Sequence, residues 1–275
     1  MKKNKSPGLD GLGAEFYKMF WDELGCILVD VFNESFDNQK LCNTQNLSVI
    51  ALIFKKGDKS EIANYRPISL SNTDYKILAF VLANRIQKVI GTIISTDQTA
   101  YIKGRSMGTN LRLINDIINH YDNINQSGIL FMADFKKAFD SISWKFILQS
   151  MAFFNFGDTM IRWINTIYSE PKACVKNNGY ISEKFEIKRG IRQGCPVSAL
   201  LFVIAAEMLG ICIRQNKELQ GYEIESSSNT IKISQYADDC ILFLRNRNDM
   251  CTAISILQQF GHVSGFRFML KSFKV

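Results

Sequence analysis

The sequence lacks the residues of a structural zinc site. It holds only two histidines, and its seven cysteines form no C-x-x-C pair. Structural zinc sites are built from such closely spaced ligands, so we expect none here. An odd, scattered set of cysteines is also more typical of a reducing compartment than of a disulfide framework. Cys195 and Cys240 have no histidine near them in the sequence, so we expect small buried residues rather than nucleophiles.

Targeting signals and membrane-spanning runs are also missing. The charged N-terminus, Met1-Lys-Lys-Asn-Lys-Ser6, is not followed by the apolar segment of a secretory signal. The longest apolar stretch, residues 199–213, contains Glu207 and is shorter than the ~20 residues that cross a bilayer. We therefore expect an intracellular protein, in the cytoplasm and nucleus, with no membrane partner.

What the sequence does contain is typical of a globular, basic protein. Of its 275 residues, 47% are hydrophobic, and the net charge is +7 with a pI near 9.0. Such a length supports one large core or two subdomains, and the positive charge suits a polyanionic partner such as nucleic acid.

Hydrophobic periodicity predicts a mixed α+β fold. Helical spacing covers residues 14–40, 75–90, 106–121, 143–154, 158–169, 197–215 and 249–263. Strand-like runs cover residues 47–54, expected to be buried, and 128–134, and hairpins are expected at 173–182, around Asn-Asn-Gly, and at 223–244. From residue 128 onward this order fits a β-α-β-β-α-β sheet with helices on one face.

Acidic residues end or interrupt two of these apolar strands. The pair Asp238-Asp239 lies between strand-like runs and suits the two-residue tip of a hairpin, and Asp134 ends the run that starts at Gly128. If the two strands are neighbours, Asp134 and Asp238 are able to share two divalent cations ~3.5–4 Å apart, an arrangement that catalyses in-line phosphoryl transfer. The alternative is that each aspartate merely caps a strand or starts a turn.

Six segments, in order, resemble the reverse transcriptases of LINE-type (non-LTR) retrotransposons. They are Ser6-Pro-Gly-Leu-Asp-Gly11 with Ala14-Glu-Phe-Tyr17, Asn64-Tyr-Arg-Pro-Ile-Ser-Leu-Ser-Asn72, Asp97-Gln-Thr-Ala-Tyr-Ile-Lys-Gly-Arg105, Ala133-Asp-Phe-Lys-Lys-Ala-Phe-Asp-Ser-Ile-Ser-Trp144, Arg189-Gly-Ile-Arg-Gln-Gly-Cys-Pro-Val-Ser198 and Tyr236-Ala-Asp-Asp239. The resemblance implies a right-hand polymerase with fingers at residues 1–127 and a ferredoxin-like palm at residues 128–275. The thumb, endonuclease and cysteine-rich tail of such polyproteins are expected to be missing from this chain.

The resemblance also assigns roles around the carboxylates. Asp134, Asp238 and Asp239 would be catalytic and would hold two Mg²⁺ ions, or Mn²⁺ in their place, with help from the backbone carbonyl of Phe135. Ala138 and Phe139 would lie at the nucleotide, with Phe139 as the steric gate that excludes a ribose 2′-hydroxyl. Without the resemblance, Phe139 would be interpreted as a core aromatic residue.

The remaining assignments concern the nucleotide and the nucleic acid. Lys55, Lys56, Arg66, Gln193 and Gly194 would bind the nucleotide, because lysine and arginine suit phosphate oxygens and glycine permits close backbone approach. Lys55 and Lys56 also suit a solvated charged turn. Arg189, Arg192 and Tyr236 would contact nucleic acid, although the arginines also suit the surface and the tyrosine the core.

The end of the chain departs from the family pattern. Met269 replaces a common asparagine, and Lys271, the candidate general acid toward pyrophosphate, lies one residue early. The leading hypothesis is an RNA-directed DNA polymerase that uses an RNA template, a DNA primer and dNTPs within a parent polyprotein. The alternatives are an inactive nucleic-acid-binding relic and an intron-maturase-like reverse transcriptase.

Overall fold

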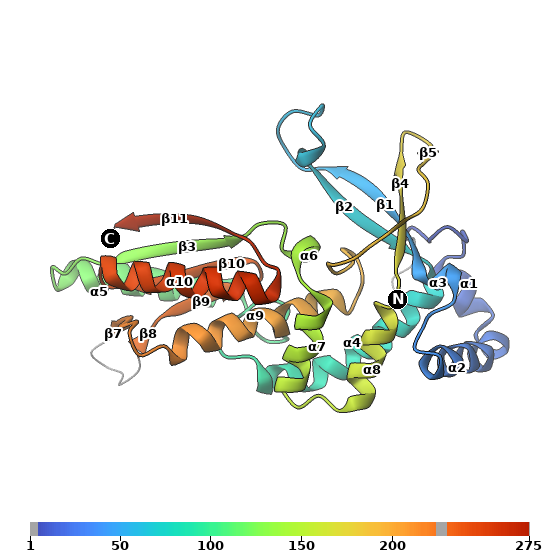
Figure 1. The fold of residues 1–275 in the computed structure, drawn as a ribbon, viewed down its shortest axis with the longest axis horizontal. Coiled ribbons are helices and arrows are strands. Elements are labelled where there is room, and N and C mark those ends of the chain that lie inside the picture. The colour runs from blue at the N-terminus through green and yellow to red at the C-terminus, as the bar shows by residue number, and fades with distance from the viewer. Residues whose placement is uncertain (1–4, 224–229, 275) are drawn as a thin grey trace. The chain divides into compact units, whose positions relative to one another are not determined.

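The computed structural model describes residues 5–223 and 230–274, which form two compact units (Figure 1). Unit 1 comprises Met1–Arg85 and Met151–Ser198, and unit 2 comprises Ile86–Ser150 and Ala199–Val275. Neither unit is continuous in sequence, and no boundary between them falls at residue 127. The division into fingers and palm at that residue therefore stays a prediction.

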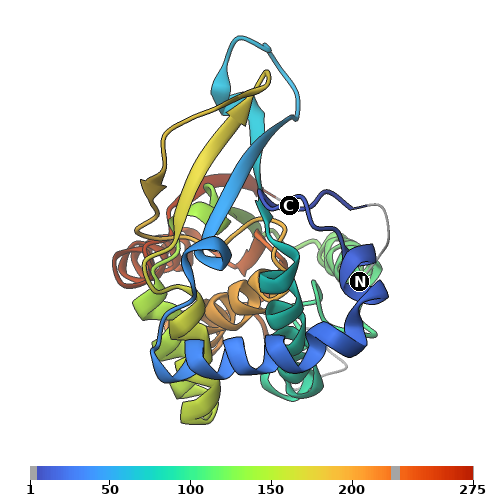
Figure 2. The ribbon, with the colours of Figure 1, turned by 90° about the vertical axis from the view of Figure 1, so that its right-hand side faces the viewer.

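Unit 1 is built on a sheet with the strand order β2-β1-β4-β5, and β6 also pairs with β4. β1 (Leu47–Phe54) is antiparallel to β2 (Tyr65–Ser71) and parallel to β4 (Lys172–Asn177), and β5 (Tyr180–Ile181) and β6 (Phe185–Glu186) are short. Figure 2 shows β1, β2 and β4 side by side, extending away from α2. The helical elements are α1 (Ala14–Met19), α2 (Trp21–Asp37), α3 (Asn43–Asn46), η1 (Ile62–Asn64), the start of α4 (Thr73–Ile93) and α8 (Asp158–Ile167).

The sheet confirms one sequence expectation for unit 1 and corrects another. The Asn-Asn-Gly hairpin is confirmed, because Asn178 and Gly179 have φ angles of 48° and 84° between β4 and β5. The expected burial of β1 is wrong for its second half, where Ile53 and Phe54 are 54% and 38% exposed. These residues extend into the β1–β2 hairpin, which leaves the core.

Unit 2 is built on a sheet with the strand order β11-β3-β10-β9, all antiparallel. The strands are β3 (Ile129–Phe135), β9 (Ile233–Tyr236), β10 (Asp239–Leu244) and β11 (Phe268–Lys274), beside a small β7–β8 pair (Tyr222–Glu223 and Thr230–Ile231). Residues 224–229 of the predicted 223–244 hairpin lie outside the described residues. The helices are α5 (Met107–Asn123), α6 (Ala138–Ser141), α7 (Trp144–Phe153), α9 (Ser198–Gln215) and α10 (Arg247–Ser264).

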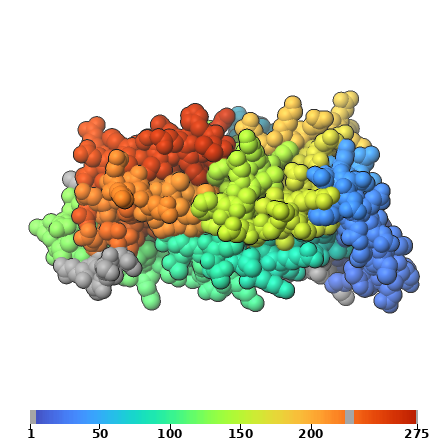
Figure 3. All heavy atoms as spheres, turned by 60° about the horizontal axis from the view of Figure 1, so that its bottom comes forward, coloured from blue at the N-terminus to red at the C-terminus, as the bar shows by residue number. Residues whose placement is uncertain are grey.

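The two faces of this sheet differ in burial. Along β3, Phe131, Ala133 and Phe135 are buried, whereas Met132 is exposed and Asp134 half-buried, as period-2 alternation requires. The buried face packs on α9, where the ring of Phe202 lies 5.7 Å from that of Phe135. α9 and α10 lie side by side in unit 2 (Figures 1 and 3).

Among the described residues of unit 2, α5 covers one end of the opposite face. There, Ile117 and Tyr121 of α5 pack with Phe243 and Leu130 from the strand ends far from Asp134, and with Ile241 in the middle of β10. The carboxylate end of that face carries the exposed Met132 and Met269. A polar site therefore lies where the helical cover of unit 2 stops.

α9 is the one helix in the described part of the chain that is long and apolar enough to cross a membrane. At 18 residues α9 is longer than the apolar stretch 199–213 seen in the sequence. The expectation that this segment is too short to cross a bilayer is therefore wrong for its length. Because 67% of it is buried inside the protein, α9 has the character of a core helix.

Candidate catalytic site

The three aspartates converge at one end of the unit 2 sheet. β10 pairs with β3 so that Asp239 lies directly opposite Asp134, and directly opposite residues in an antiparallel pair point to the same face. Asp238 lies in the turn before Asp239, and its carbonyl accepts a 3.3 Å hydrogen bond from the Phe135 N–H. Pairing of the two strands therefore brings together carboxylates that are separated by about a hundred residues in the sequence.

The turn itself is shifted by one residue from the expectation. Tyr236 pairs with Asp239 across the β9–β10 ladder, so the two-residue tip is Ala237-Asp238 rather than Asp238-Asp239. Ala237 has a φ of 53°, the left-handed conformation that tight hairpin turns require. Asp239 belongs to β10 because it is held in register against Asp134.

Electrostatics also indicate that the carboxylates are close. Asp239 is exposed, yet partial desolvation of its carboxyl raises its pKa, and the charges of Asp238 and Asp134 raise it further. Among the described residues, no group of three His, Cys, Asp or Glu side chains is arranged to hold a metal ion. The metal ligands therefore stay a prediction, although mutually repelling carboxylates are the donor type that hard divalent cations bind. The ring of Phe135 is buried in the core, so only its backbone is available for the role expected of it.

Tyr101 is a neighbour of this site that the sequence interpretation did not single out. The pKa of its hydroxyl is raised by burial, then by the charge of Asp238 and by Tyr236. Its φ of 60° is unusual for a bulky residue, and such backbone strain is concentrated at functional sites. Tyr101 lies within the motif Asp97–Arg105, but nothing in the sequence gives its distance from Asp238.

Phe139 is held beside the site by aromatic packing. It lies on α6, half-buried, and its ring stacks on Phe202 of α9 with centroids 5.3 Å apart and planes at 13°. Ala138 is buried at the start of the same helix. The contact with Phe202 fixes one side of the Phe139 ring. This agrees with the interpretation of Phe139 as a core residue, and it would also hold the ring rigidly if Phe139 acts as the steric gate.

Lys271 lies on the same sheet face as Asp134. On β11, Met269 is opposite Asp134 and Lys271 is opposite Met132, so Lys271 is two residues further along the strand. Its side chain is exposed. The general-acid role stays a prediction.

The predicted phosphate-binding residues lie in unit 1 on the β1–β2 hairpin. Lys55, Lys56 and Arg66 are all exposed. In the β1–β2 ladder, Arg66 pairs with Ile53. The Lys55 N–H donates to the Asn64 carbonyl at 2.9 Å, so this ladder of hydrogen bonds continues one residue past the end of β1. Strand alternation then places Lys55 and Arg66 on the same face of the hairpin.

Gln193 and Gly194 contact the same hairpin. The Ser69 N–H of β2 donates to the Gln193 carbonyl at 2.8 Å. Gly194 has a φ of 102°, and a Cβ there would lie 3.2 Å from the Ser69 carbonyl oxygen. Glycine is therefore required by the backbone angle, and its close approach is to β2.

Arg192 is a correction to the predicted nucleic-acid contacts. It is only 4% exposed, its guanidinium lies 4.4 Å from the centroid of the Tyr75 ring, and it donates to the Asn46 carbonyl at 3.2 Å. These contacts make Arg192 a structural residue of unit 1. Arg189 is exposed and Tyr236 half-buried, and their predicted contacts with nucleic acid remain predictions.

Both cysteines near the motifs are buried, as expected. Cys195 and Cys240 are 8% and 2% exposed. Burial, followed by the charge of Asp239, raises the pKa of Cys240 to about 12, so its thiol stays neutral at pH 7. Neither has the character of an activated nucleophile.

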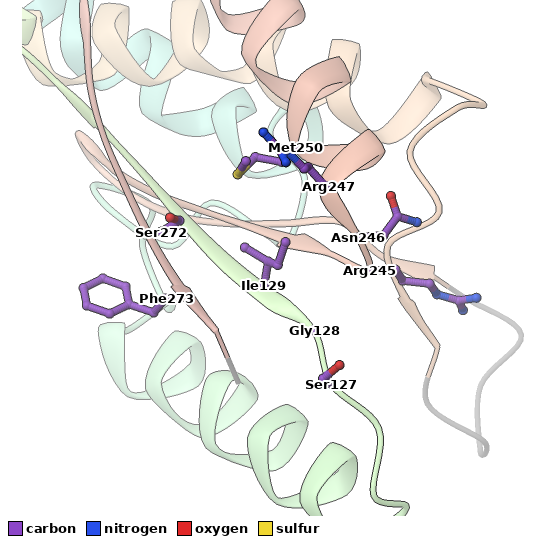
Figure 4. Close-up of a pocket in the computed structure, with 9 residues that line it drawn as sticks. All are labelled: Ser127, Gly128, Ile129, Arg245, Asn246, Arg247, Met250, Ser272 and Phe273. Atoms are coloured by element: carbon purple, nitrogen blue, oxygen red, sulfur yellow. The ribbon is translucent and has the colours of Figure 1, made fainter.

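A cavity of about 390 Å³ in unit 2 lies away from the carboxylates. Figure 4 shows Ile129 of β3 and Ser272 of β11 at this cavity, with Arg247 and Met250 from the start of α10. Ile129 and Asp134 lie at opposite ends of β3, about 16 Å apart at ~3.3 Å per residue. The cavity is therefore separate from the candidate catalytic site.

Comparison with known proteins places these features in a family. The model of the family "Reverse transcriptase (RNA-dependent DNA polymerase)" matches residues 53–272. The chain is 33% identical, over 97% of its length, to 20% of the transposon TX1 149 kDa protein of Xenopus laevis. It is also 24% identical, over 80% of its length, to 30% of a Pol polyprotein from the type-1 retrotransposable element R2 of Popillia japonica.

Solved structures show the same fold. Telomerase of Candida tropicalis, in a complex with a fragment of telomeric RNA, aligns with a TM-score of 0.62 at 12% identity, covering 92% of this chain and 44% of that one. The apo enzyme truncated from its C-terminal domain aligns with a TM-score of 0.54, covering 90% and 55%. The chain thus spans between a fifth and a third of the two retrotransposon relatives. The chain belongs to the reverse transcriptase family, as a reverse transcriptase domain of the LINE-type (non-LTR) retrotransposon branch.

Proposed function

We propose that this chain is an RNA-directed DNA polymerase that transfers nucleotides from dNTPs to the 3′-hydroxyl of a DNA primer on an RNA template. The observation that carries the proposal is the register of β3 and β10, which sets Asp134 opposite Asp239 and next to the Asp238 turn, within the part of the chain that matches the reverse transcriptase family. We further propose that it acts inside the cell, in the cytoplasm and nucleus, as part of a longer retrotransposon polyprotein.

Asp134, Asp238 and Asp239, with the carbonyl of Phe135, would hold two Mg²⁺ ions, or Mn²⁺. When bound, such ions lower the pKa of a primer hydroxyl and offset the charge of a triphosphate. The donor chemistry supports this assignment, because the charges of Asp238 and Asp134 already raise the pKa of Asp239. A cluster that is short of positive charge gains stability from a divalent cation.

We assign the unit 2 sheet to a ferredoxin-like palm. Its last strand lies beside its first, followed by the third and then the second, and helices connect the strands as in a β-α-β-β-α-β unit. Phe139, supported by Phe202, would select deoxynucleotides by leaving no room for a 2′-hydroxyl. In unit 1 we assign the β1–β2 hairpin to the fingers, with Lys55, Lys56 and Arg66 as ligands of the nucleotide phosphates.

Primer extension tests the proposal directly. The wild-type chain is given an RNA template, a labelled DNA primer, dNTPs and Mg²⁺, beside Asp238→Asn and the control Asp30→Asn on the exposed face of α2. We expect Asp238→Asn to lower the extension rate at least about 100-fold, because losing several kcal/mol of transition-state stabilisation costs a factor of ten per ~1.4 kcal/mol. Asp30→Asn should match the wild type.

Two results would overturn the proposal. Equal extension by Asp238→Asn and wild type would remove Asp238 from the catalytic site. Absence of extension by a folded wild-type chain that binds an RNA–DNA duplex would leave a nucleic-acid-binding relative without polymerase activity.

A further inference from the structure

A short segment before α5 pairs with the edge strand of the catalytic sheet. The Gln235 N–H of β9 donates to the Asp97 carbonyl at 2.9 Å, and the Thr99 N–H donates to the Gln235 carbonyl at 3.1 Å. This is a parallel bridge between Gln98 and Gln235. The segment therefore continues the sheet beyond β9, two residues from Ala237.

The Gln98 side chain holds the Ala237 backbone from both sides. Its Oε1 accepts hydrogen bonds from the N–H groups of Ala237 at 3.1 Å and Ala100 at 3.0 Å. Its Nε2 donates to the Ala237 carbonyl at 3.5 Å. Gln98 is 0% exposed, so these contacts are made without competition from water.

Ala237 needs such support. Its φ of 53° is a conformation that costs a residue with a Cβ on the order of 1–2 kcal/mol. Glycine or asparagine commonly takes this place in a hairpin turn, and an alanine side chain makes no polar contact of its own. The Gln98 amide supplies hydrogen bonds that an asparagine at position 237 would have to make locally.

Further contacts fix the segment that carries Gln98. Asn110 of α5 donates to the Ser234 hydroxyl at 2.8 Å and to the Gln235 carbonyl at 3.0 Å. Arg105 donates to the Gln98 carbonyl at 2.8 Å. The Asp97 carboxylate accepts from Arg214 of α9 at 2.7 Å. The clamp on Ala237 is thus anchored to two helices of unit 2.

We propose that Gln98 is a positioning residue for Asp238, because it fixes the backbone of Ala237 and thereby the direction of the next side chain. The catalytic part of this inference rests on the proposed function. A carboxylate displaced by about 1 Å costs a polymerase on the order of 100-fold in rate, so a rigid turn has direct kinetic value. The influence of Asp238 on Tyr101, three residues after Gln98, agrees with a segment that wraps around the turn.

The clamp is tested first without any activity. In Gln98→Met, which keeps the length of the side chain but loses its polar atoms, hydrogen exchange at the Ala237 amide should speed up about tenfold. Exchange in β3 should not change. The control Ser264→Ala removes another buried polar side chain of unit 2, which donates to the Phe260 carbonyl at 2.7 Å and accepts from the Phe266 N–H at 3.2 Å, outside the turn. Unchanged exchange at Ala237 in Gln98→Met would overturn the clamp.

Positioning is tested by Mn²⁺ binding, followed by electron paramagnetic resonance, and by kinetics. We expect Gln98→Met to weaken Mn²⁺ binding about threefold to tenfold, and to lower kcat about tenfold to 100-fold while the KM for dNTP stays within about threefold. Ser264→Ala should change none of these. Unaltered Mn²⁺ affinity and kcat in a folded Gln98→Met chain would overturn the positioning role.

Gln98→Glu gives a second variant with a pH signature. Protonated, it donates to the Ala237 carbonyl as glutamine does, whereas ionised it places a charged oxygen against that carbonyl. Its kcat relative to wild type should therefore fall as pH rises, and a ratio independent of pH would contradict the clamp. If the wild type extends no primer, the proposed function fails, while exchange and Mn²⁺ binding still decide the role of Gln98.

Discussion

Replacing Asp239 with asparagine should stabilise the protein at neutral pH. Asp239 lies opposite Asp134 in register and next to Asp238, and both charges add to burial in raising its pKa above the ordinary value of 3.8. A raised pKa means that the folded state binds the proton more tightly than the unfolded chain does. The wild type therefore loses stability as the pH rises from about 3.8 through the folded-state pKa, and that loss is complete above it.

The magnitude follows from the strand geometry. Opposite residues in an antiparallel pair have Cβ atoms about 5 Å apart, which puts the two charges about 6 Å apart. Coulomb's law then gives about 0.7 kcal/mol in bulk water and about 2.8 kcal/mol at an effective dielectric constant of about 20. Because Asp239 is exposed, solvent screening favours the lower part of this range, and we expect about 1 kcal/mol. That corresponds to a rise of about 2 °C in Tm.

The assay is thermal and urea unfolding of Asp239→Asn and wild type in EDTA at pH 7 and pH 3.5. Asp30→Asn makes the same charge change on an exposed helix and serves as control. The gain should be present at pH 7, disappear at pH 3.5, and shrink when Mg²⁺ is added, because the cation stabilises the wild type more. A variant that is less stable than wild type at pH 7, or a gain of equal size at both pH values, would refute the electrostatic argument.

Three further substitutions probe other parts of the chain. Arg192→Ala should lower the free energy of unfolding of unit 1 by about 3 kcal/mol in urea, because it leaves a cavity beside Tyr75. A variant that is as stable as wild type but binds RNA more weakly would instead support a nucleic-acid contact by Arg192. Phe139→Val should raise the incorporation of ribonucleotides relative to deoxynucleotides about tenfold, and an unchanged ratio would assign Phe139 to the core alone. Gly194→Ala should cost about 1–2 kcal/mol in urea unfolding, because its φ of 102° and the nearby Ser69 carbonyl both oppose a Cβ, and an unchanged midpoint would contradict this.

The regular elements were predictable because their signal is local. Helix and strand periodicities located β1, β3, α5 and α10 to within a few residues. The sequence pattern does not predict β11 as a strand, because Lys271 and Ser272 interrupt its apolar residues and it lies at the sheet edge.

The candidate site was predictable in its residues but not in its geometry. The motif identified Asp134, Asp238 and Asp239, yet the turn was placed one residue late, because register depends on pairing with a distant strand. Arg192 was misplaced for the same kind of reason, since its partners Asn46 and Tyr75 lie far away in the sequence.

Repulsion between the carboxylates of Asp238 and Asp239 acts on the same turn as the hydrogen bonds from Gln98, so the energetic effects of the two should be coupled. The charges of Asp238 and Asp239 favour opening of the turn, and the hydrogen bonds from Gln98 to Ala237 oppose it. At pH 7 in EDTA, Gln98→Met should therefore destabilise the wild type less than the Asp239→Asn background, by at least about 0.5 kcal/mol, because a released turn relieves repulsion only in the wild type. A double-mutant cycle in urea measures this difference, with Ser264→Ala in place of Gln98→Met as the uncoupled control. Effects that add to within about 0.3 kcal/mol would show that the two act independently. Coupling would mean that the turn keeps its strained shape against the repulsion of the carboxylates that catalysis requires, with Gln98 providing part of the restraint.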